Sequence, residues 1–217
     1  MNLLDNGYNL ILVYMLAGLT GTLWETLLHF VRDKKYVNST GSIISPFNFV
    51  YGFGGVCVIL TFYKLVDYPY LVFLLGGLLG GIVEHTLSYF EQLICHTQSW
   101  DYKGRILNIN GRTTVPIMFL WGLLCVIILY IVYVPFCGYV INRYIIDTIE
   151  HAKIYHIVMI VSLVYCIIDL ILVISVMLRH KYRVENKKAK TLYGKIIDKL
   201  FDDEYFKKHF PNSETVK

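Results

Sequence analysis

Charged residues are scarce in this chain of 217 residues: Asp, Glu, Lys and Arg together make up 17%, whereas about 25% is usual for a soluble domain. Hydrophobic residues account for 56%, and the mean hydropathy is +0.53. This balance excludes an ordinary soluble globular domain and indicates an integral membrane protein.

Proline is also rare, with five residues, and serine-rich, glutamine-rich or collagen-like tracts are missing. No repeat of solenoid length is visible either. A long disordered linker and a repeat protein are therefore excluded. We expect one compact membrane domain with a short tail.

Cysteine is limited to five residues, and no two of them have the two-residue spacing of a zinc knuckle or a redox pair. We interpret Cys57, Cys95, Cys125, Cys137 and Cys166 as small apolar helix residues. The sequence also lacks a Walker glycine loop, an HExxH motif and a Gly-x-Ser-x-Gly motif. No cofactor is expected, and any ATP hydrolysis would need a separate subunit.

Long apolar runs dominate what is present. Five of them approach the roughly 20 residues that a helix needs to cross a bilayer; they cover about residues 8–30, 46–63, 70–95, 115–134 and 155–178. The second run is short and glycine-rich after Pro46, which favours a broken or re-entrant segment. The predicted fold class is all-α: a polytopic membrane bundle of about five transmembrane helices over residues 1–178, then a basic amphipathic cytoplasmic tail over residues 179–217.

Lys and Arg are distributed unequally between the two sides of this bundle, with twelve on one side and three on the other. The positive-inside rule then places the N-terminus outside and the tail in the cytoplasm. Eleven of the 20 basic residues follow residue 178, so the formal charge of +4 belongs mainly to the tail. A basic segment directly after a spanning helix favours anionic lipid headgroups over nucleic acid as its partner.

Apolar residues recur at helical spacing within the tail. They are Leu192, Ile196, Ile197, Leu200, Phe201 and Phe206. A membrane-surface helix and a partner-docking helix both fit this pattern, and we favour the first. A similar pattern over residues 136–149 predicts a structural helix in the outer interface.

Glycines recur at the close spacing by which small residues let membrane helices approach each other. They are Gly18, Gly21, Gly54, Gly55, Gly76, Gly77, Gly80 and Gly81. We expect these residues to serve helix packing rather than ligand binding.

Acidic residues inside the apolar runs are the strongest functional signal, because each costs about 2.5–3.5 kcal/mol on insertion scales. Glu84 and Glu91 are seven residues apart, which brings them to nearly the same side of one helix. Glu25 and His29 share a face of the first helix. These acids either line a polar cavity for a cation, a proton or a cationic substrate, or are hydrogen-bonded within the bundle or paired with arginines of the following loop.

Two further possibilities remain open among the acids and histidines. Glu25, His29, Glu91 and His96 are enough for a metal site, which needs three or more convergent ligands, but they form no recognisable ligand motif, so we assign no metal. Asp169 is a lone acid in the fifth apolar run. It could pair with a buried arginine or belong to a proton path.

The most polar stretch outside the tail, residues 99–112, lies between the third and fourth apolar runs. Asn110 and Gly111 predict a tight turn within it. Arg105 and Arg112 flank this turn, where their guanidinium groups could hold phosphate or carboxylate or act only as positive-inside anchors.

Since this loop and the late polar residues of the first and third helices fall at the same cytoplasmic end, we predict a ligand site there. Its candidate residues are Glu25, Glu84 and Glu91 as acceptors, Arg105, Asn108, Asn110 and Arg112 as donors and gate, and Trp100, Asp101 and Tyr102 beside them. Trp100 and Tyr102 also suit the role of interfacial aromatics, which we favour over stacking on a substrate. No catalytic residue is assigned.

Several short motifs occur in the order found in one family. They are residues 21–25 (Gly-Thr-Leu-Trp-Glu), 37–38 with Gly41, Pro46, 51–54 (Tyr-Gly-Phe-Gly), Glu84, 100–102 (Trp-Asp-Tyr), 108–112 (Asn-Ile-Asn-Gly-Arg) and 121–122 (Trp-Gly). Over about residues 18–135 the chain resembles the bacterial membrane proteins known as type IV ABC-transporter permeases of the CmpB type. It departs from them at residues 38–41 and 48–52. At residues 38–41 the family usually has an arginine that this chain lacks. An anion-binding role of that loop would need this arginine.

The resemblance implies a multi-pass protein of the bacterial cytoplasmic (inner) membrane that takes part in transport, with a separate ATPase subunit as a partner. We therefore expect a permease-like or transport-associated subunit that binds a small ligand or ion in a polar pocket at the cytoplasmic half of the bundle. The alternatives are an intramembrane enzyme acting on a lipid or amphipathic substrate, with Glu84 or Asp101 as general base and Arg112 holding a phosphate, and a non-catalytic assembly or sensor protein. Homo-oligomerisation is left open.

Overall fold

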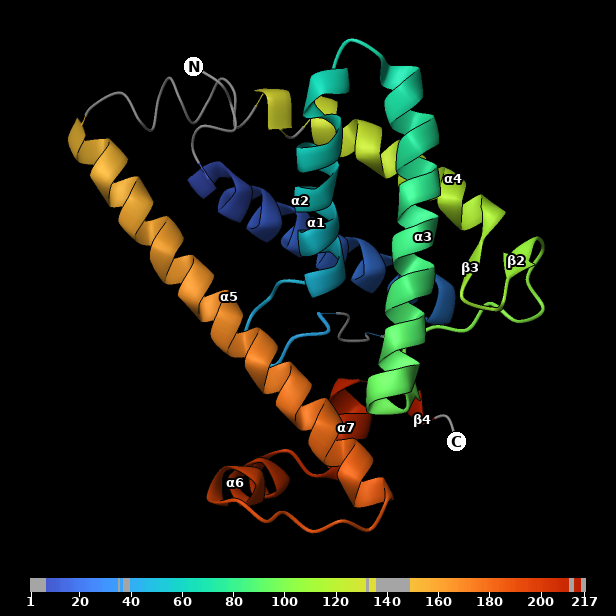
Figure 1. Cartoon of the computed structure of the whole chain (residues 1–217), viewed down its shortest axis with the longest axis vertical. Coiled ribbons are helices and arrows are strands. Elements are labelled where there is room, and N and C mark those ends of the chain that lie inside the picture. Colours follow the sequence, from blue (N-terminus) through green and yellow to red (C-terminus); the bar gives the residue numbers. More distant parts are fainter. Residues whose placement is uncertain are drawn as a thin grey trace.

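The computed structural model describes residues 7–34, 36, 40–131, 133–135, 149–210 and 213–215, and these are mainly helical (Figure 1). Within them, four helices are long and apolar enough to cross a membrane: Gly7–Val31, Pro69–Cys95, Val115–Pro135 and His151–Val184. The predicted class, a helical membrane protein, is therefore confirmed, with four candidate spans in the described chain where the sequence predicted about five. The predicted interface helix falls mainly on residues 136–148, which lie outside the described residues.

Helical elements follow one another along the described chain, and residues 128–131 and 133–135 continue α4 in π-helical form. These elements are α1 (Gly7–Asp33), α2 (Phe49–Phe62), the 3₁₀ turn η1 (Tyr63–Leu65), α3 (Pro69–Cys95), α4 (Val115–Ile127), α5 (Ile149–Val184), α6 (Leu192–Leu200) and α7 (Asp203–His209).

The second predicted span is the short helix α2. It begins after Asn48, whose side-chain oxygen accepts a hydrogen bond from Val50 N at 3.0 Å, so the N-cap sets the start of the helix rather than Pro46. Its 14 residues extend about 21 Å, whereas the hydrocarbon core is about 30 Å thick. The described chain therefore contains one shorter apolar helix beside its four candidate spans.

Helices α3 and α4 pack closely because glycine leaves room between their backbones. A Cβ atom added at Gly77 would lie 2.7 Å from the backbone oxygen of Met118, and one added at Gly76 would lie 2.7 Å from Cys125 Sγ. Gly55 makes a similar close approach to Ala17 between α2 and α1. The expected packing role is confirmed at these positions but is wrong for Gly54, which has no atom within 4 Å of an added Cβ.

The main apolar core lies where the first four helices meet. Its buried side chains include Val13 of α1, Ile59 and Phe62 of α2, Val72 of α3 and Cys125 of α4. Lipid chains are as apolar as these side chains, so the core contributes mainly through van der Waals packing.

Helix α5 runs along one side of the molecule, and α6 and α7 fold back against its lower end (Figure 1). Its 36 residues extend about 54 Å, and the expected domain boundary at residue 178 falls within it. Ile197 and Phe206 are buried together with Val173 and Val176 of α5. Other apolar residues of the expected amphipathic tail, Leu192, Ile196 and Leu200, are exposed.

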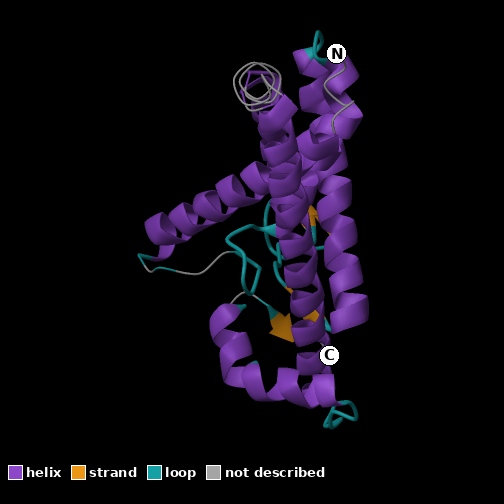
Figure 2. Cartoon of the chain, turned by 90° about the vertical axis from the view of Figure 1, so that its left-hand side faces the viewer, coloured by secondary structure: helices purple, strands orange, loops and turns teal. Residues whose placement is uncertain are grey.

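Two small antiparallel sheets complete the fold at one end of the bundle. In the first, β1 (Thr97–Gln98) pairs with β4 (Glu214–Thr215), and in the second, β2 (Asn108–Ile109) pairs with β3 (Thr113–Thr114). The C-terminal part of α1 leaves the bundle as the helix that projects to the left in Figure 2. Its Leu27, Phe30 and Val31 side chains are exposed there, at 54%, 57% and 59%.

Candidate functional site

Helix α3 ends at Cys95, and the left-handed backbone of its C-cap residue His96 (φ 55°) directs the chain into the polar loop of residues 96–114. The predicted tight turn is present in this loop. Asn110 and Gly111 both have positive φ angles, 54° and 68°, and Arg112 N donates to Ile109 O at 3.0 Å. Only residues that tolerate this left-handed region without much strain suit such a turn.

Several candidate ligand-binding residues form hydrogen bonds that close the loop on itself. Trp100 Nε1 donates to Arg112 O at 3.0 Å, and Tyr102 N donates to Gly111 O at 2.8 Å. Asn108 Oδ1 accepts a hydrogen bond from Gly111 N at 3.0 Å. The side chains of Trp100 and Asn108 therefore already have structural partners within the loop.

The carboxylate of Glu84 binds this loop to α3. Its Oε1 accepts a hydrogen bond from the Tyr102 hydroxyl at 3.0 Å, and its Oε2 accepts one from Thr113 Oγ1 at 2.6 Å. Glu84 is only 6% exposed. Burial, together with the adjacent Glu84 carboxylate, raises the pKa of the Tyr102 phenol, which therefore stays protonated and able to donate.

Aromatic side chains from two neighbouring helices lie near the Glu84 carboxylate. Tyr51 of α2 interacts electrostatically with Glu25 of α1 and with Glu84, and its ring lies 5.7 Å from that of Trp121 of α4, centroid to centroid. Trp121 Nε1 is buried next to Glu84 and interacts electrostatically with its carboxylate, although its N–H is not well aligned for a hydrogen bond with any described residue. The indole N–H is therefore a further polar group beside the Glu84 carboxylate.

We call these six residues from four helices and the loop the Glu84 cluster: Glu25, Tyr51, Glu84, Tyr102, Thr113 and Trp121. The structure places three of the proposed ligand-binding residues, Glu25, Glu84 and Tyr102, in this cluster. Tyr51, Thr113 and Trp121 were missed as site residues, although Tyr51 and Trp121 belong to the quoted motifs.

Glu91 has different hydrogen-bond partners from Glu84. Its Oε1 accepts hydrogen bonds from Thr97 Oγ1 at 2.9 Å and Ser99 Oγ at 2.8 Å, and its Oε2 accepts one from Ser99 N at 3.1 Å. Both carboxylates face the loop, but each binds a different part of it. Glu91 fixes the start of the loop next to β1.

The two loop arginines have different environments. Arg112 Nη1 donates to Ser88 Oγ at 3.0 Å, its Nη2 donates to Gln92 Oε1, and its guanidinium lies 5.6 Å from the centre of the Tyr89 ring. Arg105 is exposed. In the described part of the chain, neither arginine forms an ion pair with Glu84 or Glu91, so hydroxyl groups rather than arginines hold these acids.

The remaining loop residues are exposed or locally bonded. Asp101 Oδ1 accepts a hydrogen bond from Lys103 N at 2.8 Å, and Asp101 also forms an ion pair with the Lys103 side chain at 3.6 Å. Asn110 Nδ2 lies 3.4 Å from His85 Nε2. Neither Asp101 nor Asn110 points to a common centre with Glu84.

The four residues considered as metal ligands do not assemble. His96 Nδ1 lies 3.6 Å from Glu185 Oε1, while Glu91 binds Thr97 and Ser99. Among the residues that the structure describes, no three His, Cys, Asp or Glu side chains converge as metal ligands would.

Asp169 has partners that the sequence did not suggest. Its Oδ1 accepts hydrogen bonds from Ile43 N and Ile44 N at 3.0 and 3.1 Å, and its Oδ2 accepts one from Ser45 N at 3.0 Å. Asp169 is fully buried. Three backbone N–H groups, rather than a buried arginine, stabilise this carboxylate, and they join the loop before α2 to α5.

A family profile described as "Putative ABC-transporter type IV" matches residues 12–174. The match contains every residue of the Glu84 cluster and Asp169, and it stops before α6 and α7. No curated protein and no solved structure matches the chain. Because the profile covers most of the sequence, the chain belongs to the CmpB-type family of ABC-transporter type IV membrane proteins.

Proposed function

We propose that the chain is the membrane-embedded subunit of a transport assembly whose ATP is hydrolysed by a separate subunit, and that the Glu84 cluster contacts the transported ligand. The family supports the transport role, and the absence of a Walker motif from the sequence supports the division of labour. We place the chain in the bacterial inner membrane because of its resemblance to the family, and the distribution of Lys and Arg supports an orientation with the cluster towards the cytoplasm.

The burial of Glu84 inside a candidate spanning helix is the observation that carries this proposal. The carboxylate is held by two hydroxyl groups, and no Lys or Arg of the described chain forms an ion pair with it. An acid in such a place is costly unless it binds a proton or a cation. A small cation or a protonated amine is therefore the ligand class that the cluster suits best.

Polar loop 96–114 would act as the gate to this site. It supplies Tyr102 and Thr113, both bound to Glu84, so a ligand can replace those hydroxyl groups only if the loop moves away. Gating by a loop that completes the site is a common device in proteins that enclose a ligand.

Thermal unfolding of the detergent-purified full chain tests the ligand class. The probes are sodium, potassium, choline and spermidine chlorides, compared at equal ionic strength. We expect one of them to raise the midpoint of unfolding by a few degrees, since a ligand that binds only the folded state stabilises it. The Glu84→Gln variant should lose that shift, because the amide cannot neutralise a cation.

Asp67→Asn provides a matched control, since Asp67 is an exposed acid of the α2–α3 connection. This variant should retain the shift. The proposed site is wrong if no probe stabilises the wild-type protein, or if Glu84→Gln responds as the wild type does. A separate test of the assembly is ATP hydrolysis by the complex purified from its native membrane, which should be present with the wild-type chain.

The enzymatic alternative is not proposed, because its groups are engaged elsewhere. Asp101 is held by Lys103, and the Arg112 guanidinium is bonded to Ser88 and Gln92. A general base and a phosphate-holding group would have to meet at one point.

A further inference from the structure

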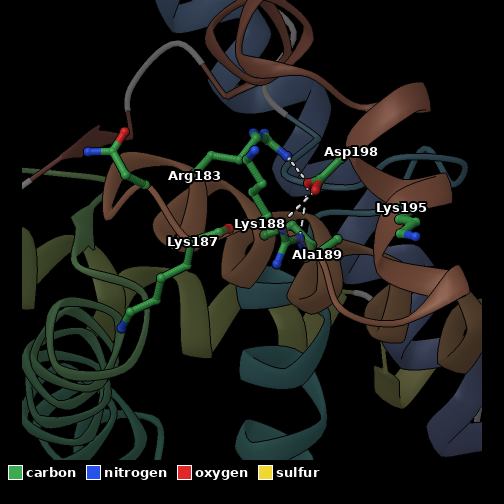
Figure 3. Close-up of a pocket in the computed structure, with 8 residues that line it drawn as sticks. Arg183, Lys187, Lys188, Ala189, Lys195 and Asp198 are labelled. Atoms are coloured by element: carbon green, nitrogen blue, oxygen red, sulfur yellow. Dashed lines mark hydrogen bonds and ion pairs between the residues drawn. The ribbon is translucent and has the colours of Figure 1, made fainter.

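A basic pocket of about 520 Å³ lies at the junction of α5 and α6, outside the Glu84 cluster (Figure 3). Its cationic lining consists of Arg179, Arg183, Lys187, Lys188 and Lys195. Asp198 also lines it, and Figure 3 shows this carboxylate next to Arg183.

The two arginines are fixed by acids, whereas two lysines are not. Arg179 Nε and Nη2 donate to the two oxygens of Asp198 at 3.0 and 2.5 Å, and Arg183 Nη1 donates to Asp198 Oδ1 at 2.7 Å. Lys188 and Lys195 are exposed and have no acidic partner within the described part of the chain. The pocket therefore has a rigid arginine wall and two lysines available to an incoming anion.

The pocket lies where α5 is expected to leave the hydrocarbon core. The apolar run of this helix ends at Leu178, and the basic sequence begins with the next residue, Arg179. The candidate span His151–Val184 is about 50 Å long, so its polar end extends beyond a core of about 30 Å. We therefore expect that end to lie at the depth of the lipid headgroups.

Helix α6 presents an apolar face beside this pocket. Leu192, Ile196 and Leu200 are spaced by four residues and are 76%, 46% and 61% exposed. Residues at this spacing lie on one side of a helix. An apolar face next to exposed lysines is typical of a helix that lies in the membrane interface.

We propose that this pocket binds the phosphate headgroup of an anionic phospholipid, with Lys188 and Lys195 as its principal contacts and the apolar face of α6 in the same leaflet. The cationic lining matches the charge of the phosphate. The α6 face identifies the occupant as a lipid, because a soluble phosphate would leave these apolar side chains uncovered beside it.

Native mass spectrometry of the detergent-purified full chain tests the assignment, by titration with phosphatidylglycerol and with phosphatidylcholine of the same acyl chains. We expect tighter binding of phosphatidylglycerol. The double variant K188Q/K195Q should weaken that binding by about 30-fold, as expected for the loss of two lysines near a charged headgroup. It leaves the Asp198 ion pairs in place, and its unfolding midpoint reports whether the fold is kept.

The matched control is K207Q/K208Q, which removes the same charge from exposed positions on α7 outside the pocket. It should bind phosphatidylglycerol almost as the wild type does. Equal losses in the two double variants, or equal binding of the two lipids, would overturn the proposal. So would displacement of the lipid by millimolar inorganic phosphate or glycerol phosphate, which would identify a soluble anion. The Glu84→Gln variant should keep the lipid site, so this result is independent of the proposed transport site.

Discussion

Asp169 Oδ2 accepts a hydrogen bond from Ser45 N at 3.0 Å, although the two residues are 124 positions apart. This contact joins α5 to the loop that leads into α2. The same loop also accepts a hydrogen bond from His209 of α7 through Ser42 O. A single carboxylate inside an apolar helix thus positions the start of α2, which carries Tyr51 of the Glu84 cluster.

We predict that Asp169→Asn destabilises the protein by about 2–4 kcal/mol, because an amide loses the charge and turns an N–H₂ group towards backbone N–H donors. Size-exclusion chromatography of heated samples should show a midpoint lowered by roughly 5 °C or more. Asp67→Asn makes the same chemical change at an exposed position and should leave the midpoint unchanged. Equal midpoints for the two variants would contradict an anchoring role for Asp169.

Removal of the Tyr102 hydroxyl should loosen the polar loop. Tyr102→Phe deletes one of the two hydrogen bonds to Glu84, which costs roughly 1–2 kcal/mol and favours opening of the loop. Trypsin should then cut after Lys103 and Arg105 about 5- to 20-fold faster than in the wild type. Tyr68→Phe, at an exposed site of the α2–α3 connection, is the control and should be cut at the wild-type rate.

The contact between α3 and α4 should not tolerate a methyl group at Gly77. A Cβ at this position would lie 2.7 Å from the backbone oxygen of Met118, which has no flexible end to move aside. We expect Gly77→Ala to lower the unfolding midpoint by several degrees. Gly54→Ala adds the same methyl group where no atom lies within 4 Å, and helix propensity favours alanine there. A midpoint at or above the wild-type value is therefore expected for Gly54→Ala, and the same result for Gly77→Ala would disprove close packing at Met118.

Acidification should release the folded tail. Hydrogen bonds from Arg179, and then from Arg183, hold the pKa of Asp198 below its ordinary value of 3.8. A carboxyl group whose pKa is lower in the folded state stabilises the fold above its unfolded pKa and loses this effect as the pH falls through the folded pKa. Limited proteolysis between pH 6 and pH 3 should therefore show protection of α6 down to about pH 4 and loss of protection below it.

The Asp198→Asn variant checks this assignment. Its tail should be more accessible to the protease already at pH 6, since Arg179 loses its carboxylate and Arg183 keeps only Asp203, and acid should add little further change. A wild-type pH profile in this variant would place the titration elsewhere, for example at Asp203, which pairs with His180 and Arg183.

The long helices could be predicted from the sequence because each coincides with an apolar run. Helices α1 and α3 begin and end within about three residues of the expected limits, and Asn110-Gly111 forms the expected turn. The packing role of most of these glycines could also be predicted, from their spacing along the chain, because small residues permit close approach wherever they face another helix. Gly54 shows the limit of that argument, since spacing does not say which face meets a neighbour.

The partners of the acids could not be predicted, because they come from irregular loops without periodicity. Asp169 binds backbone N–H groups, which every residue has, so no side-chain pattern marks Ile43 or Ser45 as its partners. Glu91 binds the hydroxyl group of Ser99, a residue within the loop expected to carry ligand donors. Tyr51 and Trp121 were visible as parts of motifs, but only the fold places them beside Glu84.

The pairing of β1 with β4 sets the order in which this end of the protein can be completed. Ser213 Oγ lies 3.1 Å from Ser99 Oγ, yet ribosomes synthesise Ser213 only after α4, α5, α6 and α7. During biogenesis, all four candidate spans can enter the bilayer while β1 still lacks its neighbour. The start of the polar loop, which Glu91 holds, thus gains its β4 neighbour only after every candidate span has been synthesised.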